Sequence, residues 1–117
     1  HTKEEKNDSM LRAPFGIIGL ETAAALTYTE LVLGGYLTPM QMAEKMSWNP
    51  ANVLGIDKGS MEEGKDADLV IFDPEKTYTI DAAKFASKSR NTPFQGRQVT
   101  GAVRMTIAGG EIVYQAR

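Results

Sequence analysis

The sequence predicts an α+β chain, with helices in its first half and a small antiparallel sheet in its second. Two observations support this prediction. From residue 19 to residue 55, apolar residues recur at helical spacing and are bracketed by helix caps. After residue 55 the pattern changes to short apolar runs and to alternation, which are typical of strands. We therefore place a domain boundary near residue 56, between residues 1–55 and 56–117.

The first helix is expected to follow a loop. Over residues 1–15 the charges alternate in sign without helical apolar spacing, and Pro14 closes the segment. Helical spacing then begins near residue 19 and ends at Gly34 and Gly35. This helix has a thin polar face, and helices this apolar are normally buried on most sides.

Two further helix starts are marked by caps. Thr38 is followed by proline and then, at the third helical position, by Gln41, which is the pattern of a capping box. That helix is expected to end near Met46. Asn49, again followed by proline, is expected to cap a third, short helix that ends at Gly55.

The second half of the chain is predicted to form a sheet. Strands are expected over four segments: residues 69–72, 77–80, 103–107 and 112–114. The first is expected to end at Asp73-Pro74, and the last two to form a hairpin around residues 108–111. A short helix at residues 81–86 and a loop at residues 87–96 would lie between the second and third of these strands.

Composition narrows the range of functions. The chain has 13 basic and 15 acidic residues, so its charge does not suggest a nucleic-acid or membrane-surface partner. It has no cysteine and a single histidine. A catalytic zinc site usually takes about three protein ligands, commonly histidines. These residues alone are therefore a poor candidate for a metalloenzyme, and we expect them to bind no zinc tightly.

Two sequence blocks carry a family resemblance, APFGIIGLET at residues 13–22 and KSRNTPFQG at residues 88–96. With the opening HTKEEK at residues 1–6, they resemble the C-terminal part of class I dihydroorotases. NPA at residues 49–51 and ADLV at residues 67–70 also fit, but the wider amidohydrolase superfamily shares them. The resemblance covers essentially the whole chain.

The resemblance implies an α/β parent fold, a (β/α)₈ barrel with a small β-sandwich built from both chain ends. The present chain would be its C-terminal fragment. Residues 1–18 would be the loop after the last barrel strand, residues 19–55 the closing helices, and residues 56–117 the C-terminal half of the sandwich. Active sites of such barrels lie at the C-terminal mouth, on the loops that follow the strands.

The implied reaction is the reversible cyclisation of N-carbamoyl-L-aspartate to L-dihydroorotate in pyrimidine biosynthesis. Two zinc ions would polarise the amide carbonyl and generate a hydroxide. The family's metal ligands and catalytic aspartate lie upstream of residue 1, so the resemblance assigns no catalytic or metal-binding residue to this chain. We expect the fragment alone to be inactive.

Substrate binding is the role that the resemblance leaves to these residues. The positions that match His1, Phe15 and Gly16 contact the substrate in the family. A histidine can donate to the substrate carboxylate, and backbone N–H groups in a Pro-Phe-Gly-Ile turn can form a concave anion site. Glycine in that turn would let the backbone approach the substrate closely.

Other functions stay open at this point. Another cyclic amidohydrolase, such as a hydantoinase or allantoinase, would keep the chemistry but change the substrate, and the PFGIIGLET block argues against it. An inactive dihydroorotase-like scaffold for aspartate transcarbamoylase would keep the fold without the catalysis. Whether the protein is a dihydroorotase or another cyclic amidohydrolase, we expect a cytoplasmic homo-oligomer that acts on a small molecule, without a nucleic-acid or membrane partner.

Four charged residues outside the expected site have plainer explanations. Asp66 and Asp68 flank a predicted strand, and we expect them to serve at a turn or a solvated edge. Lys88 and Arg90 could bind phosphate, but we favour a loop that is anchored by Asn91 and Pro93.

Overall fold

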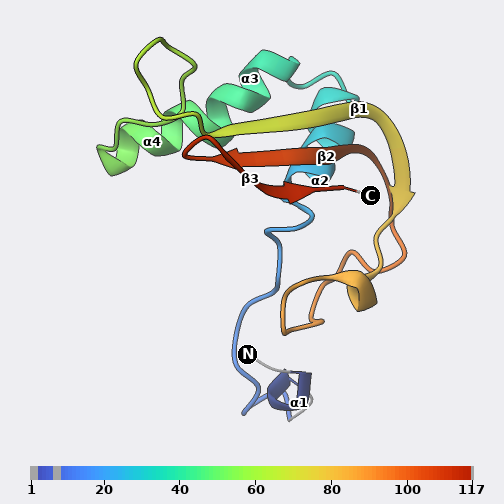
Figure 1. Ribbon diagram of the computed structural model, residues 1–117. Coiled ribbons are helices and arrows are strands. Elements are labelled where there is room, and N and C mark those ends of the chain that lie inside the picture. The colour runs from blue at the N-terminus through green and yellow to red at the C-terminus, as the bar shows by residue number, and fades with distance from the viewer. Residues whose placement is uncertain (1–2, 7–8, 117) are drawn as a thin grey trace.

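A computed structural model describes residues 3–6 and 9–116 of the chain (Figure 1). Its elements in chain order are α1 (Lys3–Lys6), α2 (Ala23–Thr27), η1 (Tyr28–Val32), α3 (Pro39–Ala43), η2 (Glu44–Trp48), α4 (Asn49–Leu54), β1 (Leu69–Thr79), η3 (Ala82–Lys84), β2 (Gln98–Ala108) and β3 (Glu111–Gln115). The three strands form one antiparallel sheet in the order β1-β2-β3. The α+β prediction for these residues is confirmed. No helix among the described residues is both long enough and apolar enough to cross a bilayer.

The N-terminal segment differs from its prediction. Residues Lys3–Lys6 form the short helix α1, so the expectation of a loop over residues 1–15 was wrong there. Glu4 and Glu5 lie in its first turn. Carboxylates at this place are stabilised by the partial positive charge of a helix N-terminus. The prediction considered only the spacing of apolar residues and therefore missed this effect.

The first long helical run begins at Ala23 and ends at Val32. It starts later than predicted because residues 20–22 form a turn. Its second half, η1, is π-helical, with wider turns than an α-helix. Gly34 ends the run as expected, and a Cβ atom at this position would lie only 2.3 Å from the Glu30 carbonyl oxygen. A larger residue would therefore block the tight return of the chain.

The capping box at Thr38 is confirmed. The Thr38 hydroxyl accepts a hydrogen bond from the Gln41 N–H at 3.2 Å. The Gln41 side chain accepts one from the Thr38 N–H at 2.8 Å. Both orphan donors at this helix start are thus satisfied by two side chains that the sequence pattern identifies.

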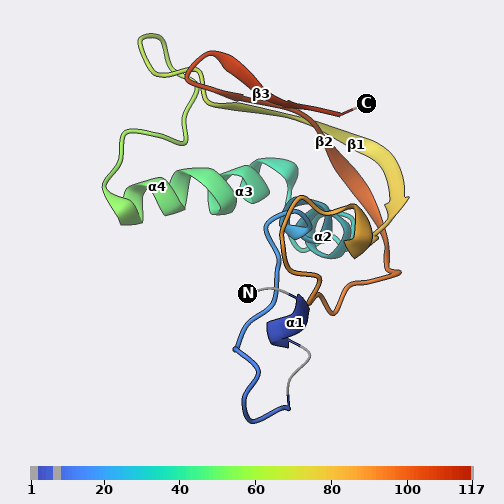
Figure 2. The same ribbon diagram turned by 60° about the horizontal axis from the view of Figure 1, so that its bottom comes forward.

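The predicted break between the second and third helices was wrong. The elements α3, η2 and α4 form one rod, which Figure 2 shows from the side. Asn49 has helical backbone angles (φ −64°, ψ −44°) and is no cap. The π-helical segment η2 comes just before Pro50, which has no N–H to donate and a ring that clashes with the carbonyl of an ordinary α-turn. The wider turn accommodates the proline, and the rod ends at Gly55 (φ +66°), as predicted.

The sheet also runs through a proline that was expected to end a strand. β1 continues past Asp73-Pro74 to Thr79, with an irregularity in its pairing to β2 between Asp73 and Thr77. The Asp73 carboxylate accepts hydrogen bonds from the N–H groups of Glu75 and Lys76 at 3.0 and 3.1 Å, which stabilise this bend. A proline is tolerated here because β1 is an edge strand. The hairpin between β2 and β3 is confirmed.

The core is small and joins the helices to the sheet. Its buried members are Ala25 from α2, Ile80 after β1, and Val99 from β2. Thr29 adds a polar link, because its hydroxyl donates to the Thr100 carbonyl at 3.0 Å and accepts from the Thr100 N–H at 2.9 Å. Residues from both sides of position 56 therefore build one core.

Candidate substrate-binding site

The segment of residues 14–21 carries the predicted site residues. It runs between α1 and α2. Phe15 is 98% exposed, and Gly16 has φ +95°, a conformation that favours glycine. His1 lies outside the described residues.

The Gly16 carbonyl is fixed by two side chains. It accepts hydrogen bonds from Lys6 Nζ and from Asn91 Nδ2, each at 2.7 Å. Lys6 also donates to the Pro14 carbonyl. On the same side of the segment, the Ile18 N–H donates to the Asn91 carbonyl at 3.0 Å. Asn91 thus holds the segment through both its side chain and its backbone, and its expected anchoring role is confirmed.

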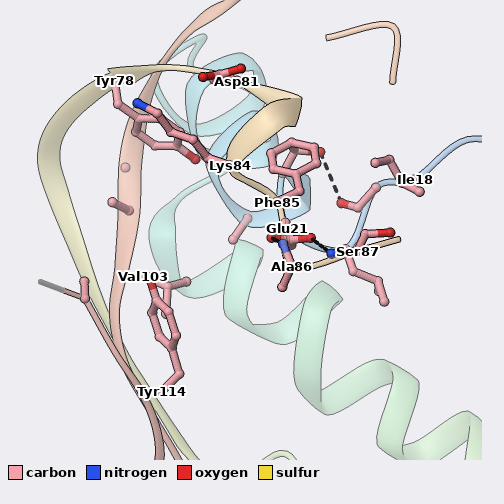
Figure 3. A pocket seen from close by; sticks show the side chains of 18 of the residues that line it. Ile18, Glu21, Tyr78, Asp81, Lys84, Phe85, Ala86, Ser87, Val103 and Tyr114 are labelled. Carbon is pink, nitrogen blue, oxygen red and sulfur yellow. Dashed lines mark hydrogen bonds between the residues drawn. The ribbon is translucent and has the colours of Figure 1, made fainter. Parts of the chain in front are cut away.

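A second tie lies at the end of the segment. The Glu21 carboxylate accepts hydrogen bonds from the N–H groups of Ala86 and Ser87, each at 3.0 Å (Figure 3). Arg90, weighed above as a phosphate ligand, instead donates to the carbonyls of Ser87 and Ser89 in its own loop. The sequence pattern gave neither Lys6 nor Glu21 a role. The partners of Glu21 lie 65 and 66 positions away, and those of Lys6 are carbonyl groups 8 and 10 positions away.

This anchoring sets the direction of the backbone donors. All described peptide bonds are trans, so the Ile17 N–H points opposite to the Gly16 carbonyl, away from Asn91. Within the described part of the chain, the N–H groups of Phe15, Gly16 and Ile17 donate no hydrogen bond. Consecutive unpartnered N–H groups in a turn attract anions. The segment therefore offers the Ile17 N–H on the side away from the contacts that hold the Gly16 carbonyl.

A larger hollow of about 1000 Å³, which Phe15 and Gly16 do not line, lies beside the sheet. Figure 3 shows it between the start of α2, the η3 region and the sheet. Its lining is rich in apolar and aromatic side chains, among them Ile17, Ala24, Tyr78, Phe85, Val103 and Tyr114. Burial raises the pKa of the Tyr78 phenol, and the nearby Tyr114 adds to this effect. A much smaller hollow, about 110 Å³, is the one that Phe15 and Gly16 line.

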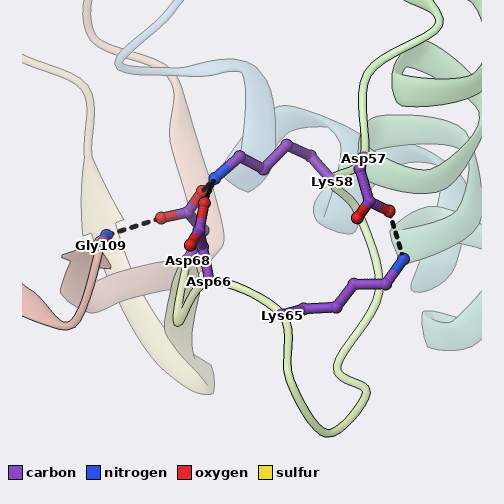
Figure 4. Close-up of polar contacts among 6 residues, drawn as sticks. All are labelled: Asp57, Lys58, Lys65, Asp66, Asp68 and Gly109. Atoms are coloured by element: carbon purple, nitrogen blue, oxygen red, sulfur yellow. Dashed lines mark hydrogen bonds and ion pairs between the residues drawn. The ribbon is translucent and has the colours of Figure 1, made fainter.

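Ion pairs order the loop that precedes β1 (Figure 4). Lys58 Nζ lies 2.6 Å from an Asp66 oxygen and 2.7 Å from an Asp68 oxygen. Lys65 Nζ lies 2.6 Å from an Asp57 oxygen. Asp66 and Asp68 therefore have the turn role expected of them.

This ion-pair cluster predicts a pH dependence of stability. Hydrogen bonds from Lys58 and from the Gly109 N–H, the latter at 2.7 Å, lower the pKa of Asp68 in the folded chain. The contribution of a carboxylate with a depressed folded pKa is complete above its unfolded pKa, about 3.9. It is lost as the pH falls through the lower, folded pKa. Asp68→Asn should therefore unfold at a lower temperature than the wild type at pH 7, and this difference should shrink as the pH falls below about 3.9 and Asp68 takes up a proton.

Thermal unfolding measured across this pH range checks the prediction. Because the pair is solvent-accessible, added salt should shrink the difference at pH 7. A constant difference between variant and wild type at every pH would contradict it.

The described residues do not fit a metal centre. Among them, no group of three or more His, Cys, Asp or Glu side chains is placed to hold a metal ion. What this part of the chain offers chemically is a set of oriented backbone donors.

Comparison with known proteins identifies the class. The model of the amidohydrolase family matches residues 7–113, so the chain belongs to that family. Over its whole length it is similar to dihydroorotases, with 55% identity over 117 residues to the enzyme of Pelotomaculum thermopropionicum and 50% over 116 residues to that of Clostridioides difficile. The resemblance inferred from the motifs is confirmed. The match takes in 100% and 99% of this chain, but only 27% of the length of each relative.

Solved structures show the same local fold in related enzymes. An L-hydantoinase from Arthrobacter aurescens superposes with a TM-score of 0.84 at 36% identity, over 92% of this chain and 24% of its own. A D-hydantoinase from a Thermus species superposes with a TM-score of 0.86 at 26% identity, over 96% of this chain and 26% of its own. The chain thus spans about a quarter of the proteins it matches.

Proposed function

We propose that the chain is the C-terminal portion of a zinc-dependent dihydroorotase, which reversibly cyclises N-carbamoyl-L-aspartate to L-dihydroorotate in pyrimidine biosynthesis. The observation that carries the proposal is the 55% identity to a dihydroorotase along all 117 residues. In the intact α/β protein, residues 1–55 would supply the last loop and closing helices of a (β/α)₈ barrel. Residues 56–117 would supply the C-terminal part of the β-sandwich.

Within this proposal the chain binds the acidic substrate. Phe15 and Gly16 carry unpartnered N–H groups in a turn, and such groups suit a carboxylate. The left-handed backbone of Gly16 and the absence of a side chain there leave room for close approach. His1 would be a further donor to the substrate.

The metal belongs to the rest of the enzyme. Two zinc ions, bound by residues outside this chain, would supply Lewis-acid polarisation and an activated hydroxide. The described residues offer no ligand group for them. Their part is to bind the substrate and to orient it, and the isolated chain is expected to be inactive.

A hydantoinase is the second candidate, because the hydantoinase structures superpose on this chain with TM-scores of 0.84 and 0.86. Both substrates are cyclic amides, but dihydroorotate carries a carboxylate on its ring and hydantoin itself does not. An inactive scaffold for aspartate transcarbamoylase is a third candidate. We favour the active enzyme, because relatives that are 55% and 50% identical over this chain are named dihydroorotases. We further infer that it acts as a cytoplasmic homo-oligomer.

A substrate comparison on the intact enzyme tests the proposal. The full-length protein would be assayed with L-dihydroorotate and with hydantoin at equal concentrations, before and after removal of metal by a chelator and restoration with zinc. We expect zinc-dependent turnover of L-dihydroorotate and little of hydantoin. Preference for hydantoin would support the second candidate, and no turnover of either would support the scaffold.

A substitution at His1 probes the substrate contact in the intact enzyme. His1→Ala should remove a hydrogen bond to a charged group, worth about 1.5–3 kcal/mol, and so lower kcat/KM about 10- to 150-fold. Steady-state kinetics with L-dihydroorotate measure it. An unchanged kcat/KM would remove His1 from the site.

A further inference from the structure

We propose that Asn91 is a positioning residue for the substrate-binding turn, by holding the Gly16 carbonyl so that the Ile17 N–H faces the substrate. This inference rests on the proposed function. Asn91 belongs to the loop between η3 and β2, and its side chain does not line the hollow at Phe15 and Gly16. It would act through the backbone of the turn.

The contact between Asn91 and the turn is two-way. Its Nδ2 donates to the Gly16 carbonyl at 2.7 Å, and its own carbonyl accepts from the Ile18 N–H at 3.0 Å. These two bonds fix the orientation of the peptide groups on either side of Ile17. Since each peptide is planar and trans, fixing the Gly16 carbonyl also fixes the Ile17 N–H on the opposite face.

The hydrogen bond from Asn91 to the Gly16 carbonyl also makes the Ile17 N–H a stronger donor. The Gly16 carbonyl accepts from Asn91 and from the Lys6 ammonium, each at 2.7 Å. Hydrogen bonds on a carbonyl polarise its peptide group, and the N–H of that group becomes a better donor. The Ile17 N–H is therefore both directed and strengthened by bonds on the face away from the substrate.

Asn91 is itself held in place before it meets the turn. The buried Ser89 hydroxyl accepts from the Asn91 N–H at 3.3 Å. The Arg90 guanidinium binds the carbonyls of Ser87 and Ser89, which closes the loop on itself. The two bonds from the Glu21 carboxylate to the start of this loop fix the loop against the segment that carries the turn.

Steady-state kinetics of the intact enzyme test the inference with two variants. Asn91→Leu replaces the amide donor with an apolar side chain of similar size. Asn91→Asp keeps the shape of the side chain and removes the donor. The matched control is Gln95→Leu. Gln95 is an amide in the same loop, and it accepts from the Ala82 N–H at 2.7 Å without touching the turn. We expect both Asn91 variants to raise KM for L-dihydroorotate about tenfold with kcat within about twofold, because a donor to a charged group is misdirected. Gln95→Leu should lower the thermal midpoint and leave KM unchanged.

Each outcome decides the matter. Wild-type KM in the Asn91 variants overturns the inference while the proposed function stands. An equal rise of KM in Gln95→Leu also overturns it, because general loosening of the loop would then suffice. If Asn91→Leu fails to fold, Asn91→Asp carries the comparison. A wild-type enzyme that does not turn over L-dihydroorotate overturns the proposed function and this inference with it.

Discussion

Purified on its own, the 117-residue chain is expected to self-associate rather than remain a monomer. In the described part of the chain, twenty large hydrophobic residues are exposed, whereas only five hydrophobic residues are buried. Burying one large aliphatic side chain is worth roughly 1.5–3 kcal/mol, so a few such contacts would drive pairing. The hollow of about 1000 Å³ beside the sheet and the free edge of β3 offer surfaces for it.

Two leucines make a matched test of where the chains meet. Leu20 lines the hollow and is 98% exposed, and Leu11 is 97% exposed but does not line it. Leu20→Lys should shift the association to higher protein concentration, and Leu11→Lys should not. Light scattering across a concentration series measures both. A wild-type monomer at tens of micromolar that unfolds cooperatively would contradict the prediction.

Gly101→Ala is expected to destabilise the fold strongly. Gly101 lies in β2 with φ +99°, and a Cβ atom there would lie 2.4 Å from Phe72 and 3.0 Å from Tyr28. Those two rings pack edge to face with centroids 5.2 Å apart, so neither moves without loss of the other contact. Backbone strain of about 1–2 kcal/mol and overpacking of about 1–3 kcal/mol add to a loss of about 2–5 kcal/mol.

A substitution at a second glycine distinguishes the cost of backbone strain from the cost of steric overlap. Gly110 in the β2–β3 turn has φ +84° and nothing within 4 Å of its Cβ position. Gly110→Ala should therefore cost only the strain, about 1–2 kcal/mol. Urea denaturation of both variants at one fixed protein concentration measures the difference. Equal losses would show that the aromatic pair yields to the added methyl group.

Local chemistry made some elements predictable and others not. The capping box at Thr38 and the left-handed stop at Gly55 use only neighbouring residues, and both were found from the sequence. The prolines misled the prediction at two places, because Pro50 was taken to start a new helix and Pro74 to end a strand. One is accommodated by a π-helical turn and the other by an edge position, and tertiary context decides both.

The candidate site shows the same division. The motif around Phe15 and Gly16 marks the turn, but Lys6 and Glu21 gain their roles only from backbone groups that the folded chain brings to them. The residues next to Lys6 and Glu21 in the sequence do not indicate which backbone groups these two side chains bind. Asn91 was expected to anchor its loop, and the structure adds what it anchors the loop to, the Gly16 carbonyl.

The tie between Gly16 and Asn91 also has a consequence during synthesis, because 75 positions separate the two residues along the chain. At about 5–20 residues per second, the turn is synthesised roughly 4–15 seconds before its anchor. For that interval Phe15 and Leu20 are exposed without the loop that later holds their segment. The turn can therefore reach its final conformation only after Asn91 has been made.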